Sequence, residues 1–205
     1  MKIVAFGSSS TEGAGASSPA KTYPSRLNAV LRTRFPGIEI TVENQGVGGE
    51  DAEEMLARLD RVIASKPDLI LWQVGTNAVL AGLNLAEQAN LIRTGLARMK
   101  ATGSDVVLID PQYVPEVINK PNATAMVKLL DSLALESGIA VFHRFAVMQH
   151  WSRVERIPFR TFTSTDGLHM NDWSYSRIAK LLADAIVEAS DRTTQTARSS
   201  GKVRS

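Results

Sequence analysis

Short apolar runs alternate with longer amphipathic segments along most of the chain. Short runs rich in Val, Ile and Leu are typical of buried strands, and segments with apolar residues at helical spacing are typical of the helices between them. This alternation predicts βαβ units and a parallel sheet. The predicted strands are Lys2–Phe6, Ile38–Val42, Leu69–Val74, Asp105–Asp110 and Ile139–Phe142.

Proline and glycine mark the boundaries of the helices predicted between these strands. Thr22-Tyr23-Pro24 begins the first helix, and Pro36-Gly37 ends its unit. The segment 144–165 has no clear period, although Phe145–Met148 fits the start of a short helix. Together the elements predict one doubly wound α/β domain with five parallel strands, over residues 1–189. The later helices are predicted at about Asp51–Ser65, Leu85–Thr102, Ala123–Ser137 and Asp172–Ser190.

Residues 190–205 differ in composition from the rest of the chain. They are rich in Ser and Thr and poor in apolar residues, which predicts a disordered tail. The formal charge of the whole chain is +2, and the tail alone carries +3, so residues 1–189 carry −1. A nearly neutral domain does not favour a nucleic-acid partner.

The composition excludes several other classes of protein. No apolar run approaches the ~20 residues that a membrane span needs. The first residues form a strand rather than a signal peptide, so we expect a cytoplasmic location if the start is native and secretion if a leader has been removed. The sequence contains no cysteine, which excludes disulfides, thiolate metal sites and cysteine nucleophiles.

Polar and glycine-rich segments follow three of the predicted strands. They are Gly7–Thr11, Asn44–Gly49 and Gly75–Asn77. Because the carboxyl ends of parallel strands meet at one edge of a sheet, we expect these segments to lie close together. The first contains three consecutive serines, Ser8–Ser10. Taken alone, these serines are more typical of turns and helix caps than of a nucleophile.

A fourth segment, Thr165–His169, changes that interpretation. Asp166 and His169 are three residues apart on a predicted turn and can hydrogen-bond to each other. The carboxylate would then fix the imidazole tautomer and leave the other ring nitrogen free to accept a proton from a hydroxyl. An Asn side chain and glycine backbone amides can stabilise the oxyanion that develops in acyl transfer. The four segments together favour a hydroxyl nucleophile.

In this order the four segments resemble the motif blocks of the SGNH hydrolases, the GDSL-type esterases and lipases. The blocks are Gly7-Ser8-Ser9-Ser10-Thr11, Asn44–Gly49, Gly75-Thr76-Asn77 and Asp166-x-x-His169. The resemblance implies a flavodoxin-like fold, a three-layer α/β/α sandwich, which agrees with the predicted elements. It implies neither a metal nor an organic cofactor.

The resemblance also implies a role for each site residue. Ser9 would be the nucleophile, His169 the general base and Asp166 the residue that orients it. The oxyanion hole would consist of the backbone amides of Ser9 and Gly49 and the side chain of Asn77.

The chain departs from the family pattern at two positions. Ser8 precedes the nucleophile and Ala78 follows Asn77, where the family usually has Asp in both places. Neither position carries the proton transfer or the oxyanion, so we expect the chemistry to survive.

The implied activity is hydrolysis of carboxylic esters through an acyl-enzyme. The absence of a long apolar lid predicts a short acyl group, with acetyl first, and a small-molecule or carbohydrate ester as the substrate. The alternatives are a thioesterase or lysophospholipase with the same residues, and a non-catalytic flavodoxin-like binding module. Six residues before Asp166 either line the alcohol side of the substrate or pack against one another at the surface: Trp151, Arg153, Arg156, Phe159, Arg160 and Phe162.

Overall fold

The computed structural model describes residues 1–201, and for residues 192–201 it describes only the backbone. Five strands form one parallel sheet in the order β2-β1-β3-β4-β5, which is the flavodoxin-like order. The predicted α/β fold class with a five-stranded parallel sheet is therefore confirmed. The strands are β1 (Lys2–Gly7), β2 (Thr41–Gly46), β3 (Leu69–Gln73), β4 (Asp105–Ile109) and β5 (Ala140–Phe142).

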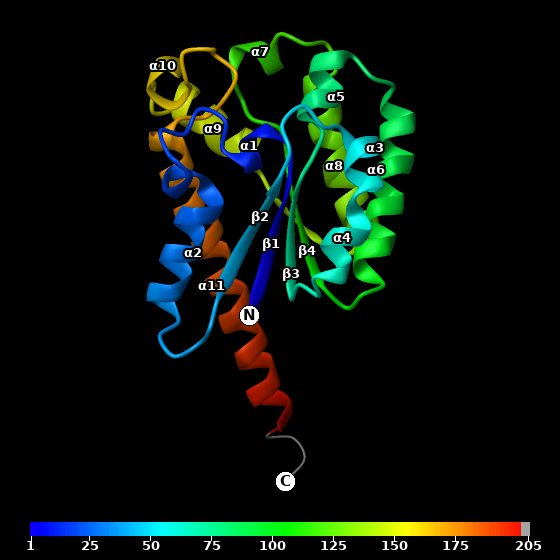
Figure 1. The fold of residues 1–205 in the computed structure, drawn as a ribbon, viewed down its shortest axis with the longest axis vertical. Helices are drawn as coiled ribbons and strands as arrows, with labels where there is room; N and C mark the ends of the chain where they lie inside the picture. Colours follow the sequence, from blue (N-terminus) through cyan, green and yellow to red (C-terminus); the bar gives the residue numbers. More distant parts are fainter. Residues whose placement is uncertain (202–205) are drawn as a thin grey trace.

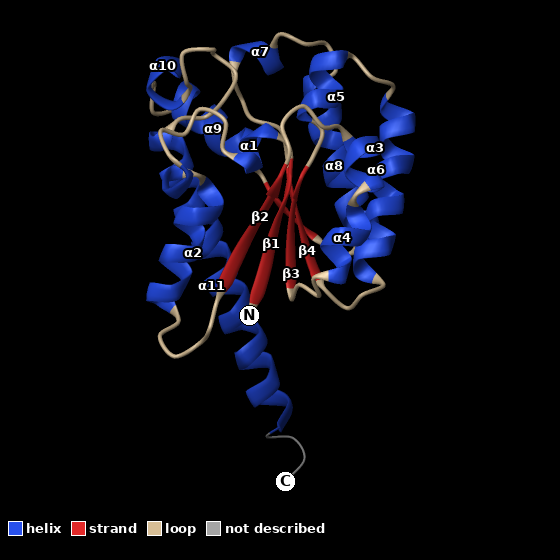
Figure 2. Cartoon of the chain, viewed as in Figure 1, coloured by secondary structure: helices blue, strands red, loops and turns tan. Residues whose placement is uncertain are grey.

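Helices cover both faces of the sheet (Figures 1 and 2). On one face α2 (Tyr23–Arg34), preceded by the short η1 (Pro19–Lys21), packs against α11 (Asp172–Gly201). The other face carries α3 (Ala52–Ala57), α4 (Leu59–Ala64), α6 (Leu85–Lys100) and α8 (Ala123–Ser137). Short helices gather beyond the carboxyl ends of the strands, namely α1 (Ser9–Glu12), α5 (Thr76–Ala81), α7 (Pro115–Ile118), α9 (Arg144–Arg153) and α10 (Phe159–Phe162).

The central strands are buried on both faces, as their continuous apolar runs predict. Every residue of β3 is buried, and Trp72 within it has no exposed surface. Gly95 of α6 lies so close to this ring that a Cβ at that position would be 2.5 Å from Trp72 Cη2. Dense packing of this kind holds the carboxyl ends of β1 and β3 in fixed positions.

The second strand was predicted too early in the chain, at Ile38–Val42. In the structure Thr41 pairs with Lys2 and Gly46 pairs with Gly7, so Asn44 and its neighbours belong to β2 and not to a loop. The edge position of β2 explains the error. At the edge of the sheet all side chains of β2 are exposed or half-buried, so the strand does not need a continuous apolar run and its polar residues resemble a loop.

The predicted helix Asp51–Ser65 is divided at Arg58 into α3 and α4. Arg58 has φ −111° and ψ 7°, outside helical geometry. This turn directs its guanidinium toward the ends of β1 and β2, where it donates to the carbonyls of Gly7 and Gln45. The division depends on these distant partners, which the helical period of the segment does not reveal.

The last helix is longer than predicted. α11 continues to Gly201, whereas the sequence placed the end of the helix and the start of a disordered tail at Ser190. Residues 202–205 of the predicted tail lie outside the described residues. Among the described residues, no helix is both long and apolar enough to cross a membrane.

Candidate active site

β1 carries Ser9 to the carboxyl edge of the sheet. The strand ends at Gly7, and Ser9 is the first residue of the short helix α1. The backbone at Gly7 is tightly enclosed, because a Cβ there would lie 2.4 Å from Thr11 Oγ1 and 2.9 Å from Gln73 Cβ. Gly7 therefore allows β1 to end close against β3 and to lead directly into α1.

Gln73, at the end of β3, anchors the loop that carries the serine. Its Oε1 accepts hydrogen bonds from the backbone amide of Ser8 (3.0 Å), from Ser8 Oγ (3.1 Å) and from Thr11 Oγ1 (3.2 Å). Ser8, Thr11 and Gln73 are all buried. Ser8, which replaces the usual family Asp, thus uses its hydroxyl to secure the loop beneath Ser9.

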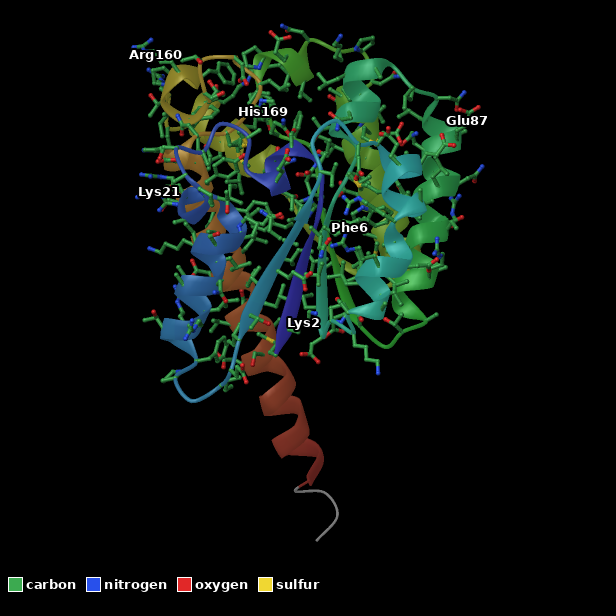
Figure 3. All side chains as sticks on the ribbon, in the orientation of Figure 1. Lys2, Phe6, Lys21, Glu87, Arg160 and His169 are labelled. Carbon is green, nitrogen blue, oxygen red and sulfur yellow. The ribbon has the colours of Figure 1, made fainter. Side chains whose placement is uncertain are left out.

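His169 lies between Ser9 and Asp166, beside α1 (Figure 3). Its Nε2 is 3.0 Å from Ser9 Oγ, and its Nδ1 is 2.6 Å from Asp166 Oδ2. An ionised carboxylate only accepts, so Asp166 requires the proton on Nδ1 and leaves the lone pair of Nε2 facing the Ser9 hydroxyl. The structure thus brings Ser9 together with the Asp166–His169 pair, although Ser9 and His169 are 160 residues apart in the sequence.

The second oxygen of Asp166 organises the turn that holds His169. Asp166 Oδ1 accepts from Ser164 Oγ (2.6 Å) and from the backbone amides of Leu168 and His169 (2.9 Å each). Partial burial raises the pKa of Asp166, but the hydrogen bonds from Ser164, His169 and Leu168 outweigh it and hold the pKa well below its usual range. Asp166 is therefore ionised at neutral pH, as a residue that orients an imidazole must be.

A close contact joins the serine loop to the histidine turn. Gly15 has φ 84°, and a Cβ at this position would lie 2.2 Å from Met170 O and 3.2 Å from His169 Cβ. Nearby, Tyr175 Oη donates to the carbonyl of Ala14 (2.6 Å). No local pattern distinguishes Gly15, because its partners lie in a segment far along the chain.

The predicted oxyanion donors come from the loop after β2 and from α5. Asn77 Nδ2 donates to the carbonyl of Glu50 (2.7 Å), which leaves its second N–H available. Gly49 has φ 86°, and a Cβ at the adjacent Gly48 would be 3.8 Å from Ser9 Cβ. The loop that carries Gly49 therefore lies beside Ser9 and is tied to Asn77.

Arg58 fixes this loop, although the sequence did not single it out. Its guanidinium pairs with the Glu50 carboxylate at 2.6 Å and donates to the carbonyls of Gln45 (3.0 Å) and Gly7 (3.1 Å). It also lies over the ring of Phe6, 4.6 Å from the ring centre. An arginine within a helical pattern is usually exposed, so no sequence signal distinguished this one.

The aromatic residues before Asp166 pack largely against one another. Trp151 and Phe162 are 5% and 0% exposed, and their rings contact each other and Trp173. These two side chains are therefore not available to a substrate. Arg160 lies at the outer surface, away from His169 (Figure 3). The remaining members of the segment are the exposed Arg153 and Arg156 and the half-buried Phe159.

The arrangement of Ser9, His169 and Asp166 can transfer a proton from a hydroxyl to an imidazole while the hydroxyl attacks an electrophile. Within the described part of the chain, no group of three or more His, Asp or Glu could hold a metal ion.

Comparison with known proteins relates this site to a family. The model of the Non-GDSL lipase-like family matches residues 1–192. No curated protein matches the sequence.

Solved structures share the fold, among them a lipase/acylhydrolase and two acetyl xylan esterases. The lipase/acylhydrolase from Enterococcus faecalis has a TM-score of 0.74 and 25% identity, with 90% of this chain and 94% of that chain covered. The acetyl xylan esterase AlAXEase has a TM-score of 0.80 and 16% identity, with 91% and 100% covered. Axe2, an acetylxylan esterase from Geobacillus stearothermophilus, has a TM-score of 0.72 and 20% identity, with 91% and 92% covered. The chain therefore belongs to the Non-GDSL lipase-like family, which confirms the resemblance to the SGNH hydrolases drawn from its motifs.

Proposed function

We propose that the protein is a carboxylic ester hydrolase that works through an acyl-enzyme on Ser9. The observation that carries this proposal is the continuous hydrogen-bonded series from Ser9 Oγ through His169 to Asp166, with distances of 3.0 and 2.6 Å. A serine alone at a strand end is common, whereas a serine aligned with an oriented imidazole is the arrangement that nucleophilic catalysis requires.

In the proposed reaction Ser9 Oγ attacks the ester carbonyl while His169 Nε2 accepts its proton. The negative charge that develops on the carbonyl oxygen is stabilised by the backbone amides of Ser9 and Gly49 and by the free N–H of Asn77. His169 then protonates the leaving alcohol, and the acyl group remains on Ser9. A water molecule, deprotonated by His169, attacks this acyl-enzyme and releases the carboxylic acid.

We propose that the acyl group is short, with acetyl as the first candidate, on a small-molecule or carbohydrate alcohol. Two solved structures with this fold, AlAXEase and Axe2, are acetyl xylan esterases. The chain also lacks a long apolar segment that would cover a fatty acyl chain beside Ser9.

Hydrolysis of p-nitrophenyl acetate, butyrate and octanoate tests the proposal. Wild type is expected to prefer acetate, and Ser9→Ala is expected to lose most of the rate, retaining only the ~10³–10⁴-fold over water that an oxyanion hole and binding can supply. Ser10→Ala serves as the control, because Ser10 adjoins the nucleophile but is not part of the hydrogen-bonded series with His169. Undiminished hydrolysis by Ser9→Ala would refute the mechanism, and a preference for octanoate would refute the short acyl group.

A further inference from the structure

Four buried polar side chains lie next to the site and are not used by the proposed mechanism. Asp110, Gln112 and Arg144 are at most 1% exposed, and Thr76 is 4% exposed. We call these four residues the Gln112 cluster. Burying a guanidinium and an amide is costly unless their polar atoms find partners. Arg144 Nη1 and Asp110 Oδ2 have no hydrogen-bond partner among the residues that the structure describes, and the partners of the other polar atoms indicate what the cluster stabilises.

Gln112 forms hydrogen bonds with both segments that carry the reacting groups. Its Oε1 accepts from Thr76 Oγ1 (3.0 Å), and Thr76 is the residue before Asn77. Its Nε2 donates to the carbonyl of Leu168 (3.4 Å), and Leu168 is the residue before His169. One side chain therefore connects the start of α5 to the turn before α11.

Arg144 determines which way the Gln112 amide points. Its Nη2 donates to Gln112 Oε1 (3.0 Å), and its Nε donates to the carbonyl of Asp110 (2.9 Å). A guanidinium has only donors, so the group that faces it must be the oxygen of Gln112, and the amide nitrogen must then face Leu168. The planar guanidinium, held at two points, leaves the amide little freedom to turn.

Asp110 in turn holds Arg144 in place. Asp110 Oδ1 accepts from the backbone amide of Phe145 (2.7 Å), at the start of α9, while its own carbonyl receives the Arg144 donor. The cluster is thus anchored at the residue that directly follows β4. A buried glutamine that merely satisfied its own polar atoms would not need partners next to Asn77 and next to His169.

We propose that Gln112 is a positioning residue that sets the distance between Asn77, the oxyanion donor, and His169, the general base. This inference rests on the proposed function. Gln112 touches neither substrate nor reacting atoms and acts through Thr76 and Leu168. Without Gln112 the segments that carry Asn77 and His169 can move independently. The general base and the oxyanion donor are then no longer held at the separation that a bound substrate requires.

The test compares Gln112→Met with Gln88→Met. Gln88 is a buried glutamine of α6 (3% exposed) that belongs to neither the site nor the Gln112 cluster. Its Oε1 has no hydrogen-bond partner in the described structure, so its variant measures how replacing a buried glutamine away from the site affects kcat, without the loss of an accepted hydrogen bond. For each variant the melting temperature, kcat and KM for p-nitrophenyl acetate are measured. Gln112→Met is expected to lower kcat roughly 10- to 100-fold, as misplacement by about 1 Å does. Its KM is expected to stay within about twofold of wild type, because the separation between Asn77 and His169 matters in the transition state and not for binding the substrate.

Thr76→Val provides a second variant, since it removes only the hydrogen bond to Gln112 at nearly the same shape. It is expected to lower kcat in the same direction by a smaller factor. Combined with Gln112→Met it is expected to lower kcat no further, because both changes remove the same bond.

Two results would overturn the positioning role. One is a kcat for Gln112→Met equal to that of Gln88→Met, whatever the change in melting temperature. The other is a double variant whose loss of kcat equals the product of the losses in Thr76→Val and Gln112→Met. If Ser9→Ala, measured alongside, hydrolysed the ester as fast as wild type, the proposed function itself would fail and the positioning role with it.

Discussion

Replacing Gly15 with alanine is expected to impair catalysis through a defined displacement of the histidine turn. The new Cβ would lie 2.2 Å from Met170 O, whereas ordinary contacts begin at 3.4 Å, so the turn must move by about 1 Å. His169 Cβ, 3.2 Å from the same position, moves with it. A misplacement of this size costs roughly 10²-fold in kcat. The left-handed backbone at φ 84° adds a stability cost of about 1–2 kcal/mol.

Gly103→Ala is the matched control for this experiment. Gly103 has the same φ of 84°, but nothing lies within 4 Å of a Cβ placed there. Both variants should therefore lose about 1–2 kcal/mol in urea unfolding through backbone strain, with a further loss in Gly15→Ala from the clash. Only Gly15→Ala should lose activity toward p-nitrophenyl acetate. Equal activity of the two variants would refute the close contact as the element that sets the position of His169.

Three further predictions concern the polar groups of the site. Gln73→Leu removes the acceptor of three buried hydrogen bonds and is expected to lower the free energy of unfolding by about 2–4 kcal/mol in urea titrations; a loss below 0.5 kcal/mol would contradict its anchoring role. Burial raises the pKa of Asp110 to about 7 from 3.8, so its protonation contributes stability that is complete below about pH 4 and is lost as the pH rises through 7. Asp110→Asn should therefore flatten the fall in melting temperature between about pH 4 and pH 7, and an unchanged fall would show that other groups cause it. Asp166→Asn is expected to reduce kcat by roughly 10²- to 10⁴-fold, because the amide no longer enforces the proton on His169 Nδ1; an activity equal to wild type would remove Asp166 from the mechanism.

The sequence predicted the parts of the site that depend on local order along the chain. Ser9 follows an apolar strand, and Asp166 and His169 share one turn, so both the strand end and the carboxylate–imidazole pair could be recognised from spacing. Parallel strands then place these segments at one edge of the sheet, whichever order the strands take. The fold class followed from the same alternation of apolar runs and amphipathic segments.

The residues that the sequence missed act across long separations. Gln112 contacts Thr76 and Leu168, and Arg58 contacts Gly7, through side chains whose neighbours in sequence give no indication of these partners. The error at β2 has the same origin. Its register is set by pairing with β1, while its own polar residues resemble a loop. Side-chain hydrogen bonds and edge-strand pairing depend on the assembled fold, so they cannot be predicted from a local sequence pattern.

Mass spectrometry of the protein quenched during turnover of p-nitrophenyl acetate tests the central claim most directly. An acetyl group is expected on the peptide that contains Ser9, present during turnover, absent after the substrate is exhausted and absent in Ser9→Ala. Hydrolysis with an acetyl group on a different residue, or with Ser9 unmodified at every quench time while Ser9→Ala remains active, would contradict the acyl-enzyme on Ser9.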